Sequence, residues 1–198
     1  MKEICNGIYM HNTKEMVGRK PREDDTDFYA TDPKAVELFL EQLKRDKIIL
    51  PKSITEPCCG NGNISKTLEK YGYEVSSSDY KDYGFGNIKN FFDIKEAACI
   101  ITNFPYKNQV EFILHGLNIS NRLICLTRTQ FLAGANKQII YKNKSLKFIY
   151  QYIKRIKVFP GNKPELARSM VDYCWLIFNH NYKGEPIFRW IGKDHENI

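Results

Sequence analysis

The order of apolar and polar residues predicts strands that alternate with helices. Two short, uninterrupted apolar runs, at 97–101 and 123–126, are typical of parallel strands covered on both faces. Apolar residues recur at helical spacing over 109–117, between these runs, and again in a segment that begins at Asp32 and Pro33. Asp32 is a favoured N-cap residue, and proline suits the first position of a helix. The alternation predicts an α/β fold.

Further segments extend the predicted sheet. Residues 53–55 and 73–79 indicate strands on either side of a second amphipathic helix, which Asn63 can cap. Residues 152–159 and 173–178 indicate the last two strands, and the short, partly polar connection between them favours an antiparallel pair. We therefore expect a mostly parallel sheet whose last strand is antiparallel.

Length and composition favour one domain. A chain of 198 residues with 42% hydrophobic residues can build one well-buried α/β core, and it is short for a second one. Residues 1–26 are polar and lack periodicity, so we expect a mobile arm there, followed by a single domain over 27–198.

The composition disfavours several classes of protein. No apolar run is long enough to span a membrane, and the first residues lack the features of an export signal. The six cysteines include no Cys-x-x-Cys pair and lie mostly in apolar runs, as reduced core thiols do. The four histidines share no ligand spacing. We therefore expect a soluble cytoplasmic protein without a metal site.

Positive charge is concentrated in one segment. The net charge is +7, and residues 128–168 hold ten lysine or arginine residues against one acidic residue. Aromatic residues in the same segment can stack on bases, so the pattern favours nucleic acid as a partner over a merely solvated face. The residues that we expect to contact nucleic acid are Arg128, Lys137, Lys142, Lys144, Lys147, Lys154, Arg155 and Lys157.

A glycine-rich turn follows the strand predicted at 53–55. Gly60 and Gly62 permit a sharp turn and let a ligand approach the backbone closely. The next strand ends at Asp79, near the spacing at which an acidic residue binds ribose hydroxyls. This unit indicates a site for a cofactor that contains adenosine.

Glu56 narrows the choice of cofactor. Its carboxylate lies beside the glycine turn, where it would repel a pyrophosphate but attract a cationic amino acid group. This favours S-adenosylmethionine over a dinucleotide.

The sequence Asn103-Phe104-Pro105-Tyr106 follows a buried strand, at the edge where open α/β sheets bind ligands. A conjugated amine is a poor nucleophile, and two acceptors aimed at its N–H bonds favour the pyramidal transition state. The Asn103 side-chain oxygen and the Phe104 carbonyl can be those acceptors. Pro105 restricts the backbone of Phe104, and Tyr106 offers a face on which a base can stack. The loop thus favours transfer to a planar amine over an ordinary turn.

These motifs resemble those of class I S-adenosylmethionine-dependent methyltransferases that act on amines. Residues 27–33 are similar to the segment before the first helix in DNA adenine methyltransferases, and residues 82–86 and 90–93 to a linker in short, phage-type adenine methyltransferases. The resemblance covers about residues 27–190. It implies a single-domain, Rossmann-like fold with a seven-stranded sheet and helices on both faces, and a place in bacterial or phage-infected host cytoplasm.

The resemblance also implies residue roles. The cofactor S-adenosylmethionine would be bound by Phe28, Tyr29, Thr31, Glu56, Pro57, Cys58, Gly60, Gly62, Asp79, Phe92 and Asp93. In this set Asp79 would bind the ribose, and Phe92 and Asp93 would lie at the adenine. The target amine would lie at Asn103, Phe104, Pro105 and Tyr106.

Two departures from the family pattern matter. Phe104 replaces the usual first proline of an Asn-Pro-Pro-Tyr loop, so the loop loses one rigid residue and the pocket can be reshaped. The order of motifs also leaves no insertion for a separate target-recognition domain. Any recognition of a nucleic-acid target sequence would therefore depend on residues 128–168 and the loops.

Adenine N6 methylation of DNA is the function that these residues favour. Adenine in RNA is the nearest alternative, because the loop chemistry is the same. A protein glutamine amide follows, although the basic segment disfavours it. A non-catalytic nucleic-acid-binding module with the same fold is a further alternative, which Phe104 leaves open. The oligomeric state does not follow from the sequence.

Overall fold

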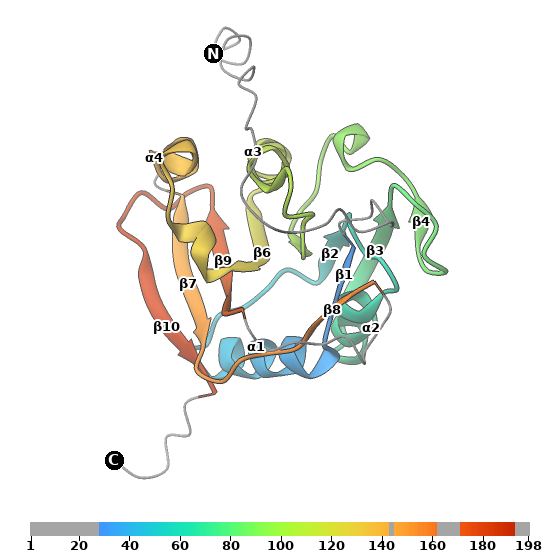
Figure 1. Cartoon of the computed structure of the whole chain (residues 1–198), viewed down its shortest axis with the longest axis horizontal. Helices are drawn as coiled ribbons and strands as arrows, with labels where there is room; N and C mark the ends of the chain where they lie inside the picture. The colour runs from blue at the N-terminus through green and yellow to red at the C-terminus, as the bar shows by residue number, and fades with distance from the viewer. Residues whose placement is uncertain (1–27, 143–144, 162–170, 193–198) are drawn as a thin grey trace, which may run out of the picture.

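The core of the molecule is an eight-stranded sheet with helices on both faces (Figure 1). The computed structural model describes residues 28–142, 145–161 and 171–192, so the arm predicted at 1–26 lies outside the described residues. The strands lie in the order β10-β7-β9-β6-β5-β2-β3-β4. Their bounds are Ser53–Glu56 (β2), Glu74–Asp79 (β3), Asn87–Ile88 (β4), Ile100–Thr102 (β5), Arg122–Arg128 (β6), Leu146–Tyr152 (β7), Tyr173–Asn179 (β9) and Ile187–Ile191 (β10).

Two pairs of helices cover the two faces. One apolar cluster joins α1 and α2 to one face of the sheet, and a second joins α3 and α4 to the other, as the two layers in Figure 1 show. The Asp32 side chain accepts from the Lys34 N–H at 2.9 Å and caps α1, as predicted. The helices are Pro33–Arg45 (α1), Asn63–Lys70 (α2), Gln109–Ile119 (α3) and Gln138–Lys142 (α4), with 3₁₀ turns at Phe91–Asp93 (η1), Thr129–Leu132 (η2) and Ala135–Lys137 (η3).

The predicted α/β fold with a mostly parallel sheet is confirmed, with two corrections to its strands. Within the described eight-stranded sheet, β9 alone runs antiparallel to its neighbours, which are β6 and β7. It is not the last strand, because β10 follows it and pairs in parallel with β7. This additional edge strand makes the sheet eight-stranded where seven strands were expected.

The strand predicted at 152–159 was wrong. The strand in this part of the chain is β7, Leu146–Tyr152, which ends where the predicted strand begins. It lies between β9 and β10, and most of its side chains are buried there. The more polar stretch 153–157 then leaves the sheet, and Val158–Pro160 (β8) pairs antiparallel with Tyr29–Thr31 (β1) in a separate two-stranded sheet. The chain after β7 therefore returns to the segment before α1.

Candidate active site

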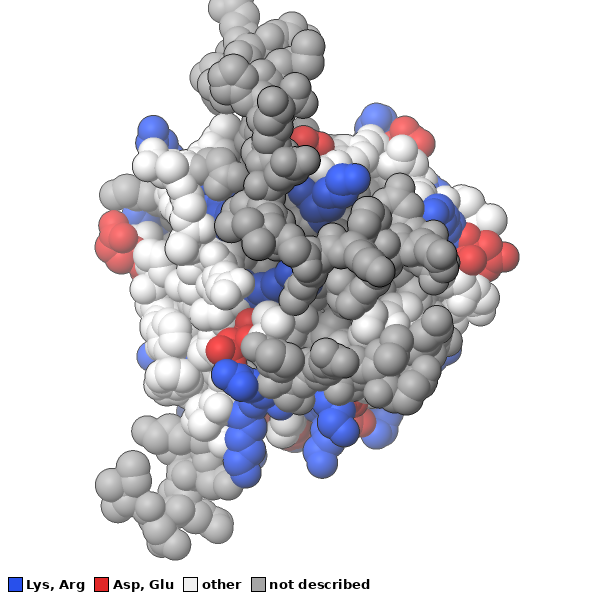
Figure 2. All heavy atoms as spheres, in the orientation of Figure 1, with Lys and Arg blue, Asp and Glu red and all other residues white. Residues whose placement is uncertain are grey.

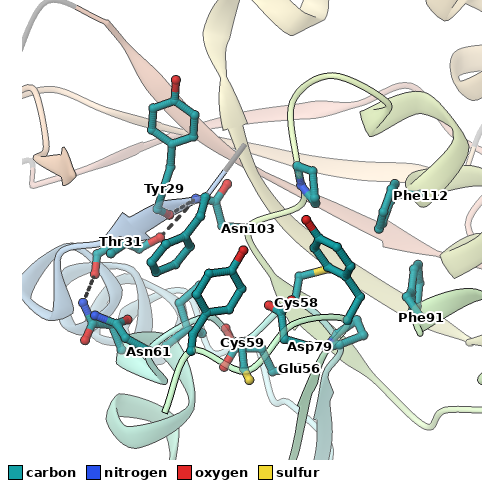
Figure 3. A pocket seen from close by; sticks show the side chains of 18 of the residues that line it. Tyr29, Thr31, Glu56, Cys58, Cys59, Asn61, Asp79, Phe91, Asn103 and Phe112 are labelled. Atoms are coloured by element: carbon teal, nitrogen blue, oxygen red, sulfur yellow. Dashed lines mark hydrogen bonds between the residues drawn. The ribbon is translucent and has the colours of Figure 1, made fainter. Parts of the chain in front are cut away.

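A cavity of about 360 Å³ lies at the edge of the sheet where β2, β3 and β5 end (Figure 3). In Figure 3 the side chains of Phe91 and Phe112 form one wall, and Glu56 and Asp79 lie together at another side of the cavity. The predicted site residues that line it are Phe28, Tyr29, Thr31, Glu56, Pro57, Cys58, Asp79, Phe92, Asn103 and Pro105. The structure therefore brings together residues far apart in the sequence.

The glycine turn after β2 is built for close packing. Gly60 (φ 51°) and Gly62 (φ 80°) have left-handed backbone conformations, and the rings of Phe28 and Phe85 cover the positions where a Cβ would project. The Gly60 N–H donates to Asp79 Oδ2 at 3.0 Å and ties the turn to the end of β3. Neither glycine lines the cavity, contrary to the cofactor-binding role predicted for them.

Asn63 does not cap α2, contrary to the prediction. Gly62 is the N-cap residue, because its left-handed conformation lets the chain turn one residue earlier. The Asn63 amide instead donates to the Thr31 carbonyl at 2.8 Å. This bond holds β1 against the start of α2.

Glu56 is a buried carboxylate beside the cavity. Its side chain accepts a hydrogen bond from the Ser65 hydroxyl, which also contacts the Ser77 hydroxyl at 2.6 Å. Burial raises the pKa of Glu56 well above its usual value, and the Ser65 hydrogen bond opposes this. No lysine or arginine of the described residues forms an ion pair with it. The site therefore suits a ligand that brings a cationic group to this carboxylate.

Asp79 lines the cavity at the end of β3, where it was predicted. It is 6% exposed, and burial raises its pKa, which the backbone N–H groups of Gly60, Lys81 and Tyr80 oppose. One carboxylate oxygen accepts from Gly60, so the group is held in a fixed orientation. A fixed carboxylate of this kind is suited to accept from ribose hydroxyls.

Asn103 has its amide oriented by β1. Its Nδ2 donates to the Tyr29 carbonyl at 3.1 Å and to Thr31 Oγ1 at 3.3 Å (Figure 3). The Asn103 Oδ1 atom is buried and has no hydrogen-bond partner among the described residues. A buried acceptor without a donor is costly, so an N–H group that reached this oxygen would be stabilising.

Phe104 is an anchor of the loop. Its side chain is 1% exposed and does not line the cavity. The ring packs on Phe91 and Phe112, with centroid distances of 5.3 and 5.4 Å. The packing of this aromatic ring holds the loop in place. A proline at this position would instead restrict the backbone through its pyrrolidine ring.

Tyr106 also lies outside the cavity lining. Its ring packs against Tyr29 at 5.1 Å, and the guanidinium of Arg128 lies over it at 4.3 Å from the centroid. Burial raises the pKa of Tyr106 well above its usual value, the Tyr173 hydroxyl adds to this, and the Asn103 amide opposes it. The stacking face predicted for Tyr106 is therefore covered in this structure.

Several residues of the cavity wall were not predicted. Phe28 stacks on Tyr83 at 4.4 Å, so an aromatic pair closes one side. The other additional lining residues with polar or aromatic side chains are Cys59, Asn61, Asn63, Tyr80, Asn90, Phe91, Lys107, Asn108 and Phe112. Asp93 is exposed and outside the cavity lining. Asn90 lines the cavity instead and accepts from the Phe92 N–H at 3.1 Å to cap η1.

The basic residues divide between two edges of the sheet. Arg128, Lys154, Arg155 and Lys157 follow the carboxyl ends of β6 and β7, on the cavity side. Lys147 lies at the start of β7, which is the opposite edge, and its ammonium is 5.7 Å from the Tyr182 ring. The rest are Lys142, which ends α4, Lys137, which donates to the Ala133 carbonyl at 2.7 Å, and Lys144, which lies outside the described residues.

Lysine and arginine side chains occur in several separate groups on the face seen in Figure 2, with acidic side chains between some of them. Residues 28–142, 145–161 and 171–192 contain no group of histidine, cysteine, aspartate or glutamate side chains that could hold a metal ion. No helix in these ranges has the length and hydropathy needed to cross a bilayer.

Comparisons with known proteins find similarity in structure alone. No protein-family profile and no curated protein sequence matches the chain. A proposed class I S-adenosylmethionine-dependent methyltransferase from Listeria monocytogenes superposes with a TM-score of 0.58 at 15% identity, over 82% of this chain and 66% of that one. A proposed RNA methyltransferase from Pyrococcus horikoshii gives 0.56 at 14% identity, over 73% and 82%.

A third structure is the methyltransferase subunit of a type I restriction-modification system from Streptococcus thermophilus. Its TM-score is 0.58 at 9% identity, and the similarity covers 83% of this chain and 47% of that one. These similarities, with the strand order above, show that the chain has the α/β, Rossmann-like fold of class I S-adenosylmethionine-dependent methyltransferases.

Proposed function

We propose that the protein transfers a methyl group from S-adenosylmethionine to the N6 amine of adenine in DNA. The observation that carries this proposal is the Asn103 amide in the cavity wall, whose nitrogen is held by β1 while its buried oxygen has no hydrogen-bond partner among the described residues. An exocyclic amine would give that oxygen the donor it lacks.

The residues of the cavity fit the cofactor. Glu56 would accept from its ammonium group, which would neutralise the buried carboxylate, and Asp79 would accept from its ribose. Phe28 and Phe92 would pack against its apolar surfaces. When bound, the cofactor supplies an electrophilic methyl group on a sulfonium. The structure does not place Asp93 for an adenine contact, so we propose Asn90 as a polar partner on that wall.

Asn103 Oδ1 and the Phe104 carbonyl would accept from the two N–H bonds of the target amine. This pair favours a pyramidal nitrogen, whose lone pair points out of the ring plane. The packing of Phe104 on Phe91 and Phe112 holds the carbonyl in position. No general base is required before transfer, because the nitrogen becomes acidic only once it is alkylated.

DNA is the acceptor favoured by charge. Arg128, Lys154, Arg155 and Lys157 follow the strands that end at the cavity edge, where phosphates of a bound duplex would lie. The fold similarity to a restriction-modification methyltransferase subunit is consistent with DNA, whereas the similarity to a proposed RNA methyltransferase keeps adenine in RNA as the second candidate. A duplex would have to release its target base from the stack.

The substrate class is tested with three acceptors in parallel. Labelled S-adenosylmethionine is incubated with duplex DNA, single-stranded DNA and RNA, and the products are digested to nucleosides. We expect N6-methyldeoxyadenosine. Label in N6-methyladenosine from RNA alone would replace DNA with RNA. Bound cofactor without transfer to any acceptor would favour a protein glutamine amide or a non-catalytic module.

A further inference from the structure

Arg128 lies in a cage of tyrosine rings. It is the last residue of β6 and pairs with Tyr173, the first residue of β9. The guanidinium carbon lies 4.3 Å from the centroid of the Tyr106 ring and 5.7 Å from that of Tyr29. A planar cation therefore covers a face of the Tyr106 ring, and Asn103 of the same loop donates to the Tyr29 carbonyl.

Ring contacts and the Tyr173 side chain hold the guanidinium of Arg128. Arg128 Nε is buried without a hydrogen-bond partner among the described residues, and the same is true of Asn103 Oδ1. An arginine with a structural role is ordinarily fixed by a carboxylate that uses its fork of donors. The described residues give Arg128 no ion pair with a carboxylate. Cation–π contacts are weak enough for another flat group to replace them.

We propose that Arg128 is a placeholder for the target base and makes the site prefer polynucleotides to free nucleosides. This inference rests on the proposed function. In the free protein the guanidinium occupies the Tyr106 face on which the base would stack. A polynucleotide offers phosphates that bind the displaced guanidinium, so base entry and arginine release support each other. A free nucleoside has no phosphate and must displace the arginine without that compensation.

The basic residues around the cage favour this exchange. Lys154 and Lys157 are exposed in the segment that joins β7 to β8, and β8 pairs with β1, the strand of Tyr29. Arg155 in the same segment donates to Asp172, whose backbone carbonyl accepts from Thr129 N–H next to Arg128, so phosphates bound to this segment would lie near the end of β6. A bound nucleic acid would therefore offer the guanidinium an anionic partner.

The test uses 2-aminopurine deoxyriboside, a neutral fluorescent analogue of adenosine whose emission is quenched by stacking. We expect Arg128→Met, which keeps an apolar stem but removes the guanidinium, to bind the nucleoside about tenfold more tightly than the wild type, the effect of one cation–π contact. The same variant should bind an oligodeoxyadenylate several-fold more weakly. Lys147→Met is the matched control, since it removes a ring-stacked cation at the opposite sheet edge and should change neither.

Equal or weaker nucleoside binding by Arg128→Met would overturn the proposal, provided that its melting temperature matches the wild type. If that variant is destabilised, Arg128→Gln gives the same comparison. Adding Tyr106→Ala to either variant should abolish the gain, and a gain that persists would also overturn the placeholder role. The methylation assay with the wild type is a separate test. If the wild type methylates adenine but Arg128→Met does not bind the nucleoside more tightly, only the placeholder role of Arg128 is contradicted. If Arg128→Met binds the nucleoside more tightly but the wild type methylates no adenine, the proposed function is contradicted.

Discussion

At the scale of single residues, the burial of Glu56 bears on the proposed binding of the cofactor. Its carboxylate is 1% exposed and has a raised pKa because of burial. A buried carboxylate with a hydroxyl donor and no cation is expensive to ionise, and a ligand ammonium would reverse that cost. Ionised Glu56 is therefore expected to destabilise the protein without cofactor and to stabilise the proposed complex with S-adenosylmethionine.

Glu56→Gln should weaken S-adenosylmethionine binding at least tenfold, because a hydrogen bond to a charged group contributes about 1.5–3 kcal/mol. The same substitution should stabilise the protein without cofactor near neutral pH. A carboxyl with a raised pKa in the folded state adds stability below its unfolded pKa, and this contribution is lost as the pH rises through the folded pKa. Calorimetry and pH-dependent thermal melting measure both effects. Unchanged affinity would contradict the assigned role.

Phe104 explains how the loop keeps its shape without a second proline. Phe104→Ala should lower the free energy of unfolding by about 3–5 kcal/mol, since a ring that is 1% exposed leaves a cavity between Phe91 and Phe112. Phe104→Leu should cost less, because it keeps much of the packing. Urea denaturation gives the comparison. A loss below about 1 kcal/mol for the alanine variant would show that the ring does not anchor the loop.

At the scale of elements, the segment between β7 and β8 joins the basic residues to the site. Lys154→Glu combined with Arg155→Glu should weaken DNA binding at least tenfold and reduce the slope of log affinity against log salt by about 2. Arg155 forms an exposed ion pair with Asp172 at 2.9 Å, which adds little stability, so the fold should persist.

Lys147→Glu is the control for this prediction, because Lys147 lies at the opposite edge of the sheet. Fluorescence anisotropy over a salt series gives the slopes. An equal loss of DNA affinity in Lys147→Glu would mean that binding depends on the net charge of the protein and not on basic residues at the cavity edge.

At the scale of the whole molecule, the alternation of strands and helices and the meeting of Glu56, Asp79 and Asn103 at one edge of the sheet could be predicted from the sequence. Glu56, Asp79 and Asn103 each follow or end a strand, and parallel strands bring their carboxyl ends to one edge. The extent of β7 could not be predicted, because the polar residues 153–157 follow it without a turn signal. The eighth strand and the packing partners of Phe104 could not be predicted, because both depend on contacts between residues far apart in the sequence.

The number of basic residues in segment 128–168 did not show where those residues lie on the molecule. Ten basic residues in one segment indicate a polyanion, but the segment crosses the sheet, so Lys147 and Arg128 lie at opposite edges. The arginine over Tyr106 could not be predicted either. Tyr106 follows β5 and Arg128 ends β6, which are parallel neighbours in the sheet, but strand order alone does not show that the two side chains stack.

The measurement that tests the central claim most directly compares Asn103→Ala with the wild type. Both proteins are incubated with labelled S-adenosylmethionine and duplex DNA, and the label in N6-methyldeoxyadenosine is counted. We expect the wild type to form this product and the variant to lose at least about 100-fold in rate, the effect of removing one oriented hydrogen-bonding group at a reaction centre, while cofactor affinity stays within about threefold. Full transfer by Asn103→Ala would contradict the assignment of this loop as the catalytic site.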